Sequence, residues 1–361
     1  MDAVECHVLL ERSRGTRIPD DPTEIRLFSK CRNEQLRLPE FLRHYRALGV
    51  QRFFFADNAS TDGSLEYLES QPDVHVFFTT GSFREARGGT TWLNALLAQF
   101  GVGRWCVTVD IDELLYYPGS ETASLQALTR HFDGAGVEAM RCHLLDMYPA
   151  GAISDSAYKP GESLVNAAPW FDRGPYSRLP HGECPGVLIY GGVRERIFFP
   201  EAREGGWRRH LHVGLYHRAI YKIPGLRSLK ALDSRRPVFP PCLTKVPLVR
   251  WDAQSQYLNV NHFVSPKRVA AESGVLLHFK FLQDFHARAE REAARGEYYD
   301  GAIEFRRYAA RLRVDPRVTF RYEGSARFET SDQLVELGLM DDTPAWRQAR
   351  TSQPVRRQAR S

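Results

Sequence analysis

The segment from residue 25 to residue 115 alternates strand and helix patterns, and this alternation limits the possible folds more than any other feature of the sequence. Short apolar runs predict strands, and apolar residues at helical spacing predict the helices between them. The strands are expected at 25–29, 50–56, 74–79 and 105–110, and the helices at 38–48, about 65–68 and 92–100. Strands that alternate with helices form a mainly parallel sheet flanked by helices. We therefore expect an α/β fold whose first half is a doubly wound nucleotide-binding unit.

An acidic cluster follows the last of these strands, at Asp110, Asp112 and Glu113. Residues two apart on a strand point to the same side, so the carboxylates of Asp110 and Asp112 are expected to face one spot. Two like charges at one spot repel each other unless a cation lies between them, and hard divalent cations bind carboxylate oxygens. The alternative is an exposed Asp-x-Asp in a turn or a helix cap. Neither Gly-x-Gly-x-x-Gly nor a Gly-Lys-Ser/Thr loop is present, which argues against dinucleotide-binding and P-loop enzymes.

The rest of the chain is predicted to complete the domain with less regular elements. A helix at about 122–132 and a strand at about 137–145 precede a long ordered loop at 150–186, which has the composition of a lid or a binding wall. Further strands are expected at 187–190, 194–199, 245–251, 257–263 and 275–281, followed by helices from 282 to about 312 that break near Gly296. We divide the chain into a lead at 1–23, one domain at 24–312 and a polar, partly disordered tail at 313–361. Within the domain, 24–118 is the nucleotide half, 119–281 the acceptor half and 282–312 the C-terminal helical region.

The composition is that of an ordinary soluble protein, with 43% hydrophobic and 26% charged residues among 361. The formal net charge of +5 is spread along the chain, which argues against a nucleic-acid partner and suits a polyanionic substrate or loose contact with an anionic membrane surface. No run of about 18 apolar residues predicts a transmembrane segment. The six cysteines lie far apart without a Cys-x-x-Cys, so we expect neither disulfides nor a zinc site. A cytoplasmic location is expected, with peripheral contact at the inner face of the membrane left open.

The motifs along the first half, taken in order, resemble those of a known family. They are Cys31-Arg32-Asn33-Glu34, Leu48-Gly49-Val50, Asp57-Asn58-Ala59-Ser60-Thr61-Asp62-Gly63, Trp105 and Asp110-Ile111-Asp112-Glu113. This set resembles the family 2-type glycosyltransferases of GT-A fold, and more closely the bacterial branch similar to the family 92 (DUF23-like) enzymes. The resemblance covers roughly residues 25–150. It implies an inverting transfer of a sugar from a nucleotide-sugar donor, with Mn²⁺ or Mg²⁺ as cofactor.

The resemblance also implies roles for individual residues. Asp57 would bind the nucleobase, usually uracil, which makes a UDP-sugar the expected donor. Asp112 would ligate the metal, and Asp110 would lie nearer the ribose or a metal-bound water. A late histidine often completes such a metal site; His278 is the first candidate, and His262 is the reserve. The remaining nucleotide-sugar contacts are expected at Cys31, Asn33, Glu34, Asn58, Ile111 and Lys280.

Alternatives remain for two of these residues. His278 would instead be a core histidine packed on Phe279, and Lys280 a surface lysine with a buried stem. Arg84 and Arg87 precede a predicted helix, where two guanidinium groups suit diphosphate oxygens. The alternative for them is a pair of solvated arginines.

Inversion needs a general base that takes the proton of the acceptor hydroxyl. Glu195 is the first candidate by its spacing from the metal motif, and Asp172 and Asp146 are rivals. A simple ion pair of Glu195 with its neighbouring arginines is the alternative. His210 and His212 form a His-x-His pair, but their arginine neighbours favour a basic surface or an acceptor wall over a metal site.

The leading hypothesis is a metal-dependent glycosyltransferase that acts on a glycan, lipid-linked or other hydroxyl acceptor. A nucleotidyltransferase is the first alternative, but it would show a glycine-rich loop after the first strand, where this chain has Lys30-Cys31-Arg32-Asn33. A non-catalytic nucleotide- or glycan-binding protein of the same fold is the second. The sugar, the acceptor and the linkage are not specified by these motifs.

Overall fold

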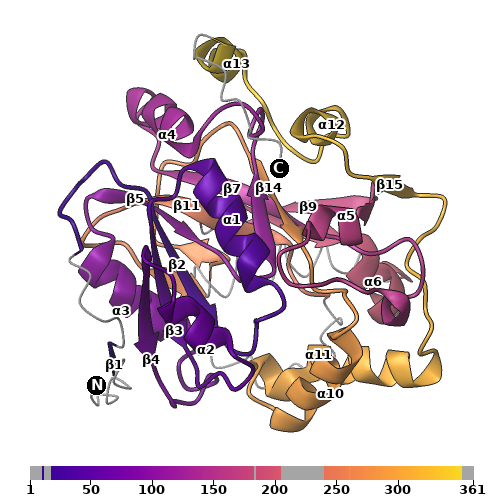
Figure 1. The fold of residues 1–361 in the computed structure, drawn as a ribbon. Coiled ribbons are helices and arrows are strands. Elements are labelled where there is room, and N and C mark those ends of the chain that lie inside the picture. The colour runs from indigo at the N-terminus through magenta and orange to yellow at the C-terminus, as the bar shows by residue number, and fades with distance from the viewer. Residues whose placement is uncertain (1–9, 12–17, 183, 205–239, 260, 352–361) are drawn as a thin grey trace, which may run out of the picture.

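A nine-stranded sheet runs through the part of the chain that the computed structural model describes, which is residues 10–11, 18–182, 184–204, 240–259 and 261–351. In spatial order its strands are β1 (Leu10–Glu11), β4 (Val74–Phe78), β3 (Arg52–Asp57), β2 (Arg26–Cys31), β5 (Arg104–Thr108), β11 (Thr244–Trp251), β7 (Ala139–Asp146), β14 (Gly274–His278) and β6 (Glu113–Tyr116). Six of these strands run in one direction, namely β4, β3, β2, β5, β7 and β14, whereas β1, β11 and β6 oppose them. The prediction of an α/β fold with a mainly parallel sheet flanked by helices is confirmed (Figure 1).

Helices cover both faces of the first half of the sheet. The connecting helices are α1 (Leu38–Leu48), α2 (Ser64–Glu69), α3 (Thr90–Phe100) and α4 (Leu125–Gly134). Along β3, Phe53 and Phe55 belong to the same apolar cluster as α1, α2 and α4, whereas Phe54 belongs to the cluster that contains α3. This alternation follows from the two-residue period of a strand, and it explains why a continuous apolar run forms β3.

Helix α1 begins and ends where its sequence signals predict. A proline lies in its first turn, where no intrahelical N–H bond is lost, and Gly49 ends it with a left-handed backbone at φ 103°. The Gly49 amide donates to the carbonyl oxygens of Tyr45 and Arg46. Helix α1, which follows the carboxyl end of β2, therefore has a defined start and a defined end.

Two of the strands predicted in the second half are wrong. Residues 194–199 lie instead mostly in helix α6 (Gly192–Phe198), which follows Gly191 at φ 133° and begins with Gly192 at φ 68°. Val193 and Phe198, both buried, pack into an apolar cluster with α10 and α11, which a strand with alternating faces would not allow. The predicted strand at 257–263 is a hairpin of β12 (Tyr257–Asn259) and β13 (Phe263–Val264).

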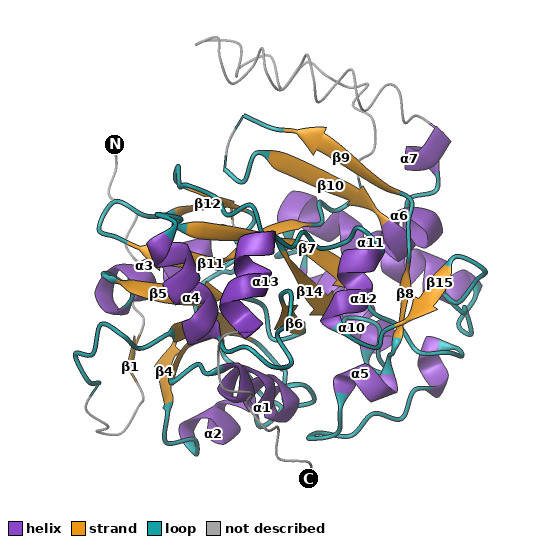
Figure 2. Cartoon of the chain, turned by 90° about the horizontal axis from the view of Figure 1, so that it is seen from above, coloured by secondary structure: helices purple, strands orange, loops and turns teal. Residues whose placement is uncertain are grey.

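The segment at 150–186, predicted as a long loop, contains several short elements. They are a 3₁₀ turn (Ile153–Asp155), α5 (Leu164–Ala167), β8 (Trp170–Asp172) and β9 (Tyr176–Pro180). Strand β9 pairs with β10 (Val187–Gly191), and β8 pairs with β15 (Ser325–Arg327). Figure 2 shows the β9–β10 hairpin on the opposite side of the molecule from α1 and α2. The short helix α7 (Glu201–Glu204) follows α6.

The C-terminal helices pack onto the sheet and onto each other. Helices α10 (Phe285–Arg295) and α11 (Tyr299–Val314) lie side by side, and the break between them falls at Gly296, as predicted. Later come α12 (Ser331–Glu336) and α13 (Pro344–Thr351), and Trp346 on α13 is fully buried. His210, His212 and residues 352–361, the end of the tail expected at 313–361 to be polar and partly disordered, lie outside the described residues. No helix among the described residues is both long and apolar enough to cross a lipid bilayer.

Candidate functional site

A cleft opens at the carboxyl ends of β2 and β5, where the strand order reverses. The strand order is β4-β3-β2-β5. Helix α1, which follows β2, lies on one face of the sheet, and helix α3, which precedes β5, lies on the other face, so the connections of these neighbouring strands lead to opposite faces. Ligands of open α/β sheets bind at such points. The cleft is lined by Lys30, Cys31, Arg32, Glu34, Asn58, Phe83, Trp92, Asp110, Ile111, Asp112, His278, Lys280, Arg288, Glu292, Arg295, Tyr298 and Phe305.

Asp110 is held by two lysines and lies in a turn. Strand β5 ends at Thr108, and the amide of Glu113 donates to the Asp110 carbonyl oxygen at 3.0 Å. The prediction that the strand reaches Asp110 is wrong, because the chain must turn here to begin β6. The alternation of a strand therefore does not set the directions of the two aspartates. The Asp110 carboxylate pairs with Lys30 and, at 3.3 Å, with the Nζ of Lys245.

Lys245 is a buried cation shared between carboxylates. Its Nζ also lies 3.0 Å from Glu113 Oε1 and donates to Asn261 Oδ1 at 2.6 Å. Burial opposes its charge, but Asp110 and Glu113 outweigh this effect and raise the pKa of Lys245 to about 12. Burial likewise opposes the charge on Asp110, yet Lys245 and Lys30 hold the pKa of that carboxyl below its usual value.

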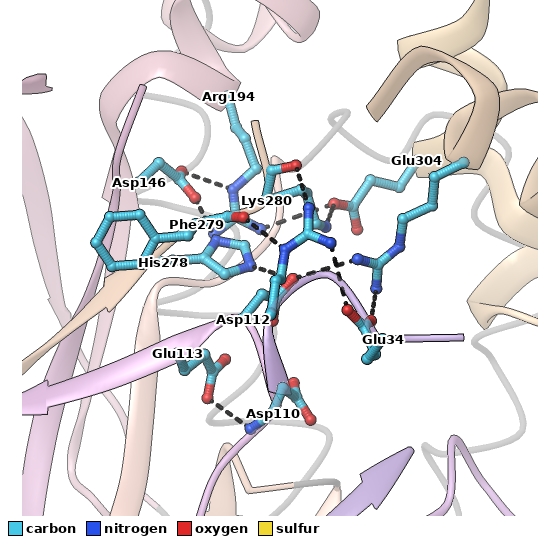
Figure 3. A network of polar contacts seen from close by, with 12 residues as sticks. Glu34, Asp110, Asp112, Glu113, Asp146, Arg194, His278, Phe279, Lys280 and Glu304 are labelled. Carbon is cyan, nitrogen blue, oxygen red and sulfur yellow. Dashed lines mark hydrogen bonds and ion pairs between the residues drawn. The ribbon is translucent and has the colours of Figure 1, made fainter. Parts of the chain in front are cut away.

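Asp112, His278 and Asp146 form a chain of contacts in the floor of the cleft (Figure 3). His278 Nδ1 lies 2.6 Å from Asp146 Oδ1, and His278 Nε2 lies 3.3 Å from Asp112 Oδ2. All three residues are buried. An ionised carboxylate only accepts hydrogen bonds, so Nδ1 carries a proton toward Asp146. When the ring is neutral, Nε2 therefore presents its lone pair toward Asp112.

The ionisation of this group follows from its charges. Burial disfavours the protonated imidazole, but Asp112 and Asp146 outweigh burial and raise the pKa of His278 above its usual value. The pKa of Asp112 is held well below its usual value, because His278, Arg288 and Arg37 outweigh the effect of burial. Without another cation, a protonated His278 neutralises Asp112.

Asp146 links the histidine to the helices beside the cleft. Its Oδ2 accepts a hydrogen bond from Arg194 Nε at 2.8 Å, and Arg194 is itself buried on α6. Arg194 Nη1 lies 3.7 Å from Glu304 Oε1 on α11, and the same carboxylate oxygen lies 3.2 Å from the Nζ of Lys280 (Figure 3). These contacts fix the orientation of His278 from two helices.

Helix α10 covers the cleft with arginines. Arg288 pairs with Glu34 Oε1 at 2.6 Å, and its Nη1 lies 3.8 Å from Asp112 Oδ2. Arg295 donates to Asn58 Oδ1 at 3.1 Å. Burial raises the pKa of Glu34 to about 7 against the opposing effect of Arg288 and Arg37. The cavity left between these side chains is about 120 Å³, smaller than is usual for a pocket that holds a whole organic ligand.

Arg288, Arg295 and Lys245 are not among the site residues expected from the sequence. Arg288, Glu292 and Arg295 follow each other at four and three residues in a predicted helix, which places them on one face. That spacing, directly after the His278-Phe279-Lys280 motif, was the available signal. Lys245 gave no such signal, because its place beside Asp110 depends on the pairing of β11 with β5.

The donor set suits a divalent cation at Asp112 and His278. Ligand atoms of Asp112, Glu113 and His278 all lie within 4.8 Å of one another. The 3.3 Å between His278 Nε2 and Asp112 Oδ2 is close to the roughly 3 Å that separates neighbouring ligands around an octahedral Mg²⁺ or Mn²⁺. A carboxylate that orients the ligating histidine, as Asp146 does, is a usual feature of metal sites. Glu113 suits the cation less well, because Lys245 and the Asp110 amide already occupy its oxygens.

The expected nucleotide contacts fall into two groups. Cys31, Glu34, Asn58, Asp110, Ile111 and Lys280 line the cleft. Asn33, Asp57, Arg84 and Arg87 are not among its lining residues. Asp57 is buried and accepts from the Ser60 amide and hydroxyl, at 3.1 and 2.5 Å, and burial raises its pKa. Asn33 accepts from the Thr61 amide at 2.7 Å, and the side chains of Arg84 and Arg87 are exposed.

Of the base candidates, Asp146 contacts His278, whereas Asp172, Glu195 and the reserve ligand His262 are not among the lining residues of the cleft. Asp172 is buried in a bidentate pair with Arg196, at 3.0 and 2.9 Å, and accepts from the Tyr148 hydroxyl at 2.6 Å. Glu195 is buried in the first turn of α6, and both neighbouring arginines pair with aspartates. His262 Nδ1 lies 2.6 Å from the Thr244 carbonyl oxygen.

In a comparison with known proteins, no family model matches this chain. Over 109 residues the chain is 29% identical to a glycosyltransferase family 92 protein of Oryza sativa subsp. japonica. The match covers 28% of this chain and 17% of the rice protein, so this chain corresponds to a minor part of that relative. The similarity supports a relationship to glycosyltransferases.

Proposed function

We propose that this protein transfers a sugar from a nucleotide-sugar, with UDP as the nucleotide, to a hydroxyl acceptor such as a glycan or a lipid-linked sugar. The observation that carries this proposal is the contact chain Asp112–His278–Asp146 at the carboxyl edge of the sheet, next to a cleft lined by cations. The similarity to a family 92 glycosyltransferase supports the same reaction class. We infer further that the sheet is of the GT-A type.

In this proposal Asp112 and His278 hold Mn²⁺ or Mg²⁺ against the diphosphate of the donor. The bound cation would neutralise charge that develops on the departing diphosphate. Lys30, Arg288 and Lys280 line the same cleft and carry the positive charge that phosphate oxygens require. Asp146 keeps the Nδ1 proton on His278 in place, so that Nε2 stays available as a ligand.

Donor binding requires the side chains over the cleft to exchange partners. The present cavity of about 120 Å³ is filled at its edges by the pair of Arg288 with Glu34 and that of Lys280 with Glu304. Phosphate oxygens would replace the carboxylates as partners of these cations. Glu34, with its pKa raised to about 7, loses little when Arg288 leaves it, because it accepts a proton near neutral pH.

We propose an inverting reaction with Glu195 as the first candidate for the base that takes the acceptor proton. Asp172, a rival for this role, is held by other side chains in the structure. Its two carboxylate oxygens are already occupied by the bidentate bonds from Arg196 and the bond from the Tyr148 hydroxyl. A movement of α6 toward the acceptor would be needed to bring Glu195 to the cleft.

The test measures UDP release from a panel of UDP-sugars with Mn²⁺, in the wild type and in Asp112→Asn. Hydrolysis of the donor by water serves as the readout, since the acceptor is not identified. We expect release that depends on Mn²⁺ and falls at least about 100-fold in Asp112→Asn, because a metal ligand is lost. Asp252→Asn is the matched control, because Asp252 is exposed and lies far from the cleft along the sheet. It follows Trp251, which pairs with Arg104 at the start of β5, whereas the cleft lies at the end of β5.

Two outcomes would overturn the proposal. The first is no UDP release from any donor by folded wild-type protein, and the second is an unchanged rate in Asp112→Asn. Release of pyrophosphate from a nucleoside triphosphate and a sugar phosphate would instead support the nucleotidyltransferase alternative.

A further inference from the structure

A second cavity, of about 250 Å³, lies outside the cleft, between β7, β10 and the segment before α13. Its lining residues are Arg141, Cys142, His143, Arg178, Val187, Ile189, Ser273, Leu339 and Asp341. None of them lines the cleft at Asp112. His143 precedes Asp146 by three residues on β7, which is about 10 Å along a strand. The cavity therefore lies against the same sheet as the cleft, but at a different position.

His143 is a buried imidazole whose ring nitrogens lack partners within the described part of the chain. Its exposed fraction is 2%, and neither Nδ1 nor Nε2 has a hydrogen-bond partner there. The ring meets the Tyr176 ring edge-on, with centroids 4.4 Å apart, which fixes its orientation beside the cavity. A buried polar group without a partner has given up its hydrogen bonds to water and gained none in return, which destabilises the folded protein. A group that enters the cavity and bonds to the ring would remove this cost.

Two arginines place positive charge on the same cavity. Arg141 Nη2 donates to Asp341 Oδ2 at 3.0 Å, and Ser273 Oγ donates to the same oxygen at 2.8 Å. Arg178 Nη2 donates to the Gly338 carbonyl oxygen at 2.8 Å, which uses one of the five N–H donors of a guanidinium. With His143 neutral, the lining carries two positive charges and one negative charge. The excess favours an anionic ligand.

We propose that this cavity binds a small hydroxylated organic anion, of the size of one sugar acid or one sugar phosphate. Guanidinium groups bind carboxylate and phosphate oxygens bidentately, which accounts for the anionic group. A neutral imidazole offers one donor and one acceptor, so a ligand that satisfies both nitrogens must also donate, as a hydroxyl group does. The cavity is slightly smaller than pockets for drug-sized ligands, which suits a single ring. The proposal does not depend on catalysis at the cleft.

The state of His143 agrees with this geometry. Burial, followed by the nearby Arg178, lowers the pKa of His143 to about 3, so the ring is neutral at neutral pH. The arginines therefore bind the anionic group of the ligand, and the neutral imidazole bonds to the hydroxyl group of the ligand.

The experiment titrates the full chain with D-glucuronate, glucose 6-phosphate, glucose and inorganic phosphate by calorimetry. We expect at least one of the two organic anions to bind at least about tenfold more tightly than glucose or inorganic phosphate. Arg178→Gln should weaken that binding at least about tenfold, and it should fold because the side chain is exposed. Arg268→Gln is the control, since Arg268 is an exposed arginine paired with Glu138 elsewhere on the surface.

The imidazole ¹⁵N NMR signals of His143 in the wild-type protein supply a second readout. Ligand binding should shift these signals, and His143→Gln should weaken binding while the protein stays folded. Two results would overturn the proposal: no binding of either organic anion at millimolar concentration, or binding that is equal in the wild type and Arg178→Gln. Inorganic phosphate that binds as tightly as glucose 6-phosphate would overturn the selection for a hydroxyl group.

Discussion

Asp146→Asn should weaken metal binding although it changes neither of the two proposed ligands. Asp146 accepts from Arg194 Nε at 2.8 Å through one oxygen and from His278 Nδ1 at 2.6 Å through the other. An asparagine has only one oxygen. If that oxygen faces Arg194, its NH₂ group faces His278, and the imidazole must move its proton from Nδ1 to Nε2. Nε2 then points an N–H at Asp112 and has no lone pair for a cation.

The size of the effect follows from this exchange of tautomers. Loss of the carboxylate that orients a metal-binding histidine typically weakens metal affinity by about 10- to 100-fold. This corresponds to roughly 1.4–2.7 kcal/mol of binding free energy. The opposite orientation of the asparagine does not avoid the cost, because its NH₂ group would then face the buried Arg194 guanidinium. We therefore expect the dissociation constant for Mn²⁺ to rise at least about tenfold.

Calorimetric titration with Mn²⁺ checks this prediction directly, with thermal unfolding to confirm that the variant is folded. Asp172→Asn is a matched control for metal affinity, because Asp172 is equally buried and also pairs with an arginine and one further donor. It should lose stability to a similar extent and keep the affinity of the wild type. An Asp146→Asn protein that binds Mn²⁺ within about twofold of the wild type would refute the orientation of His278 argued from the structure.

Two further predictions concern stability. Trp346→Ala should destabilise the protein by about 3–5 kcal/mol in urea unfolding, because the indole is fully buried and its Nε1 donates to the Pro118 carbonyl oxygen at 2.8 Å. Arg347→Ala, beside it and exposed, should change stability by less than about 1 kcal/mol, and equal losses would contradict the packing of α13. His143 has a folded-state pKa of about 3, below the ordinary 6.5 of the unfolded chain, so the unfolded state binds the extra proton first. Its contribution to stability is therefore full above about pH 6.5 and falls as the pH drops toward 3, and the melting temperature of His143→Gln should decline less than that of the wild type between pH 7 and pH 5.

The first half of the fold could be predicted from the sequence because its information is local. Each strand from β2 to β5 is a short apolar run, and Phe53, Phe54 and Phe55 are all buried because both faces of β3 are covered. The stop of α1 at Gly49 is likewise a local signal, since a left-handed residue favours glycine.

The second half could not be predicted in the same way because its pairings join distant segments. Nothing in the sequence of β11 indicates that it enters the sheet antiparallel between β5 and β7. Residues 194–199 were expected to form a strand, and they end in the apolar run Ile197-Phe198-Phe199. In the structure, Arg194 and Arg196 instead pair with Asp146 and Asp172, and a helix satisfies both pairs. The contacts of this segment, polar and apolar, are thus with residues distant in the sequence.

In the candidate site, too, some residues could be predicted from the sequence and others depend on long-range packing. Asp112 and His278 could be named from a family resemblance, and the structure places them side by side although 166 residues separate them in sequence. Lys280 could also be named, but Arg288, Arg295 and Lys245 could not, because an arginine or lysine is most often a solvated side chain. Only the packing of α10 and β11 against the cleft distinguishes Arg288 and Lys245 from such residues.

The two aspartates of the Asp-Ile-Asp turn have different partners, and this argues for different roles. Asp110 is neutralised by Lys30 and Lys245, whereas Asp112 faces an imidazole that can give up its proton to make room for a metal. Asp110→Asn should therefore cost about 1–3 kcal/mol of stability, through lost charge-assisted bonds, and change Mn²⁺ affinity by less than about threefold. Asp112→Asn should reduce Mn²⁺ affinity at least about 100-fold under the same conditions. Equal losses of affinity in the two variants would show that both carboxylates ligate the cation, and that the lysines leave Asp110 when it binds.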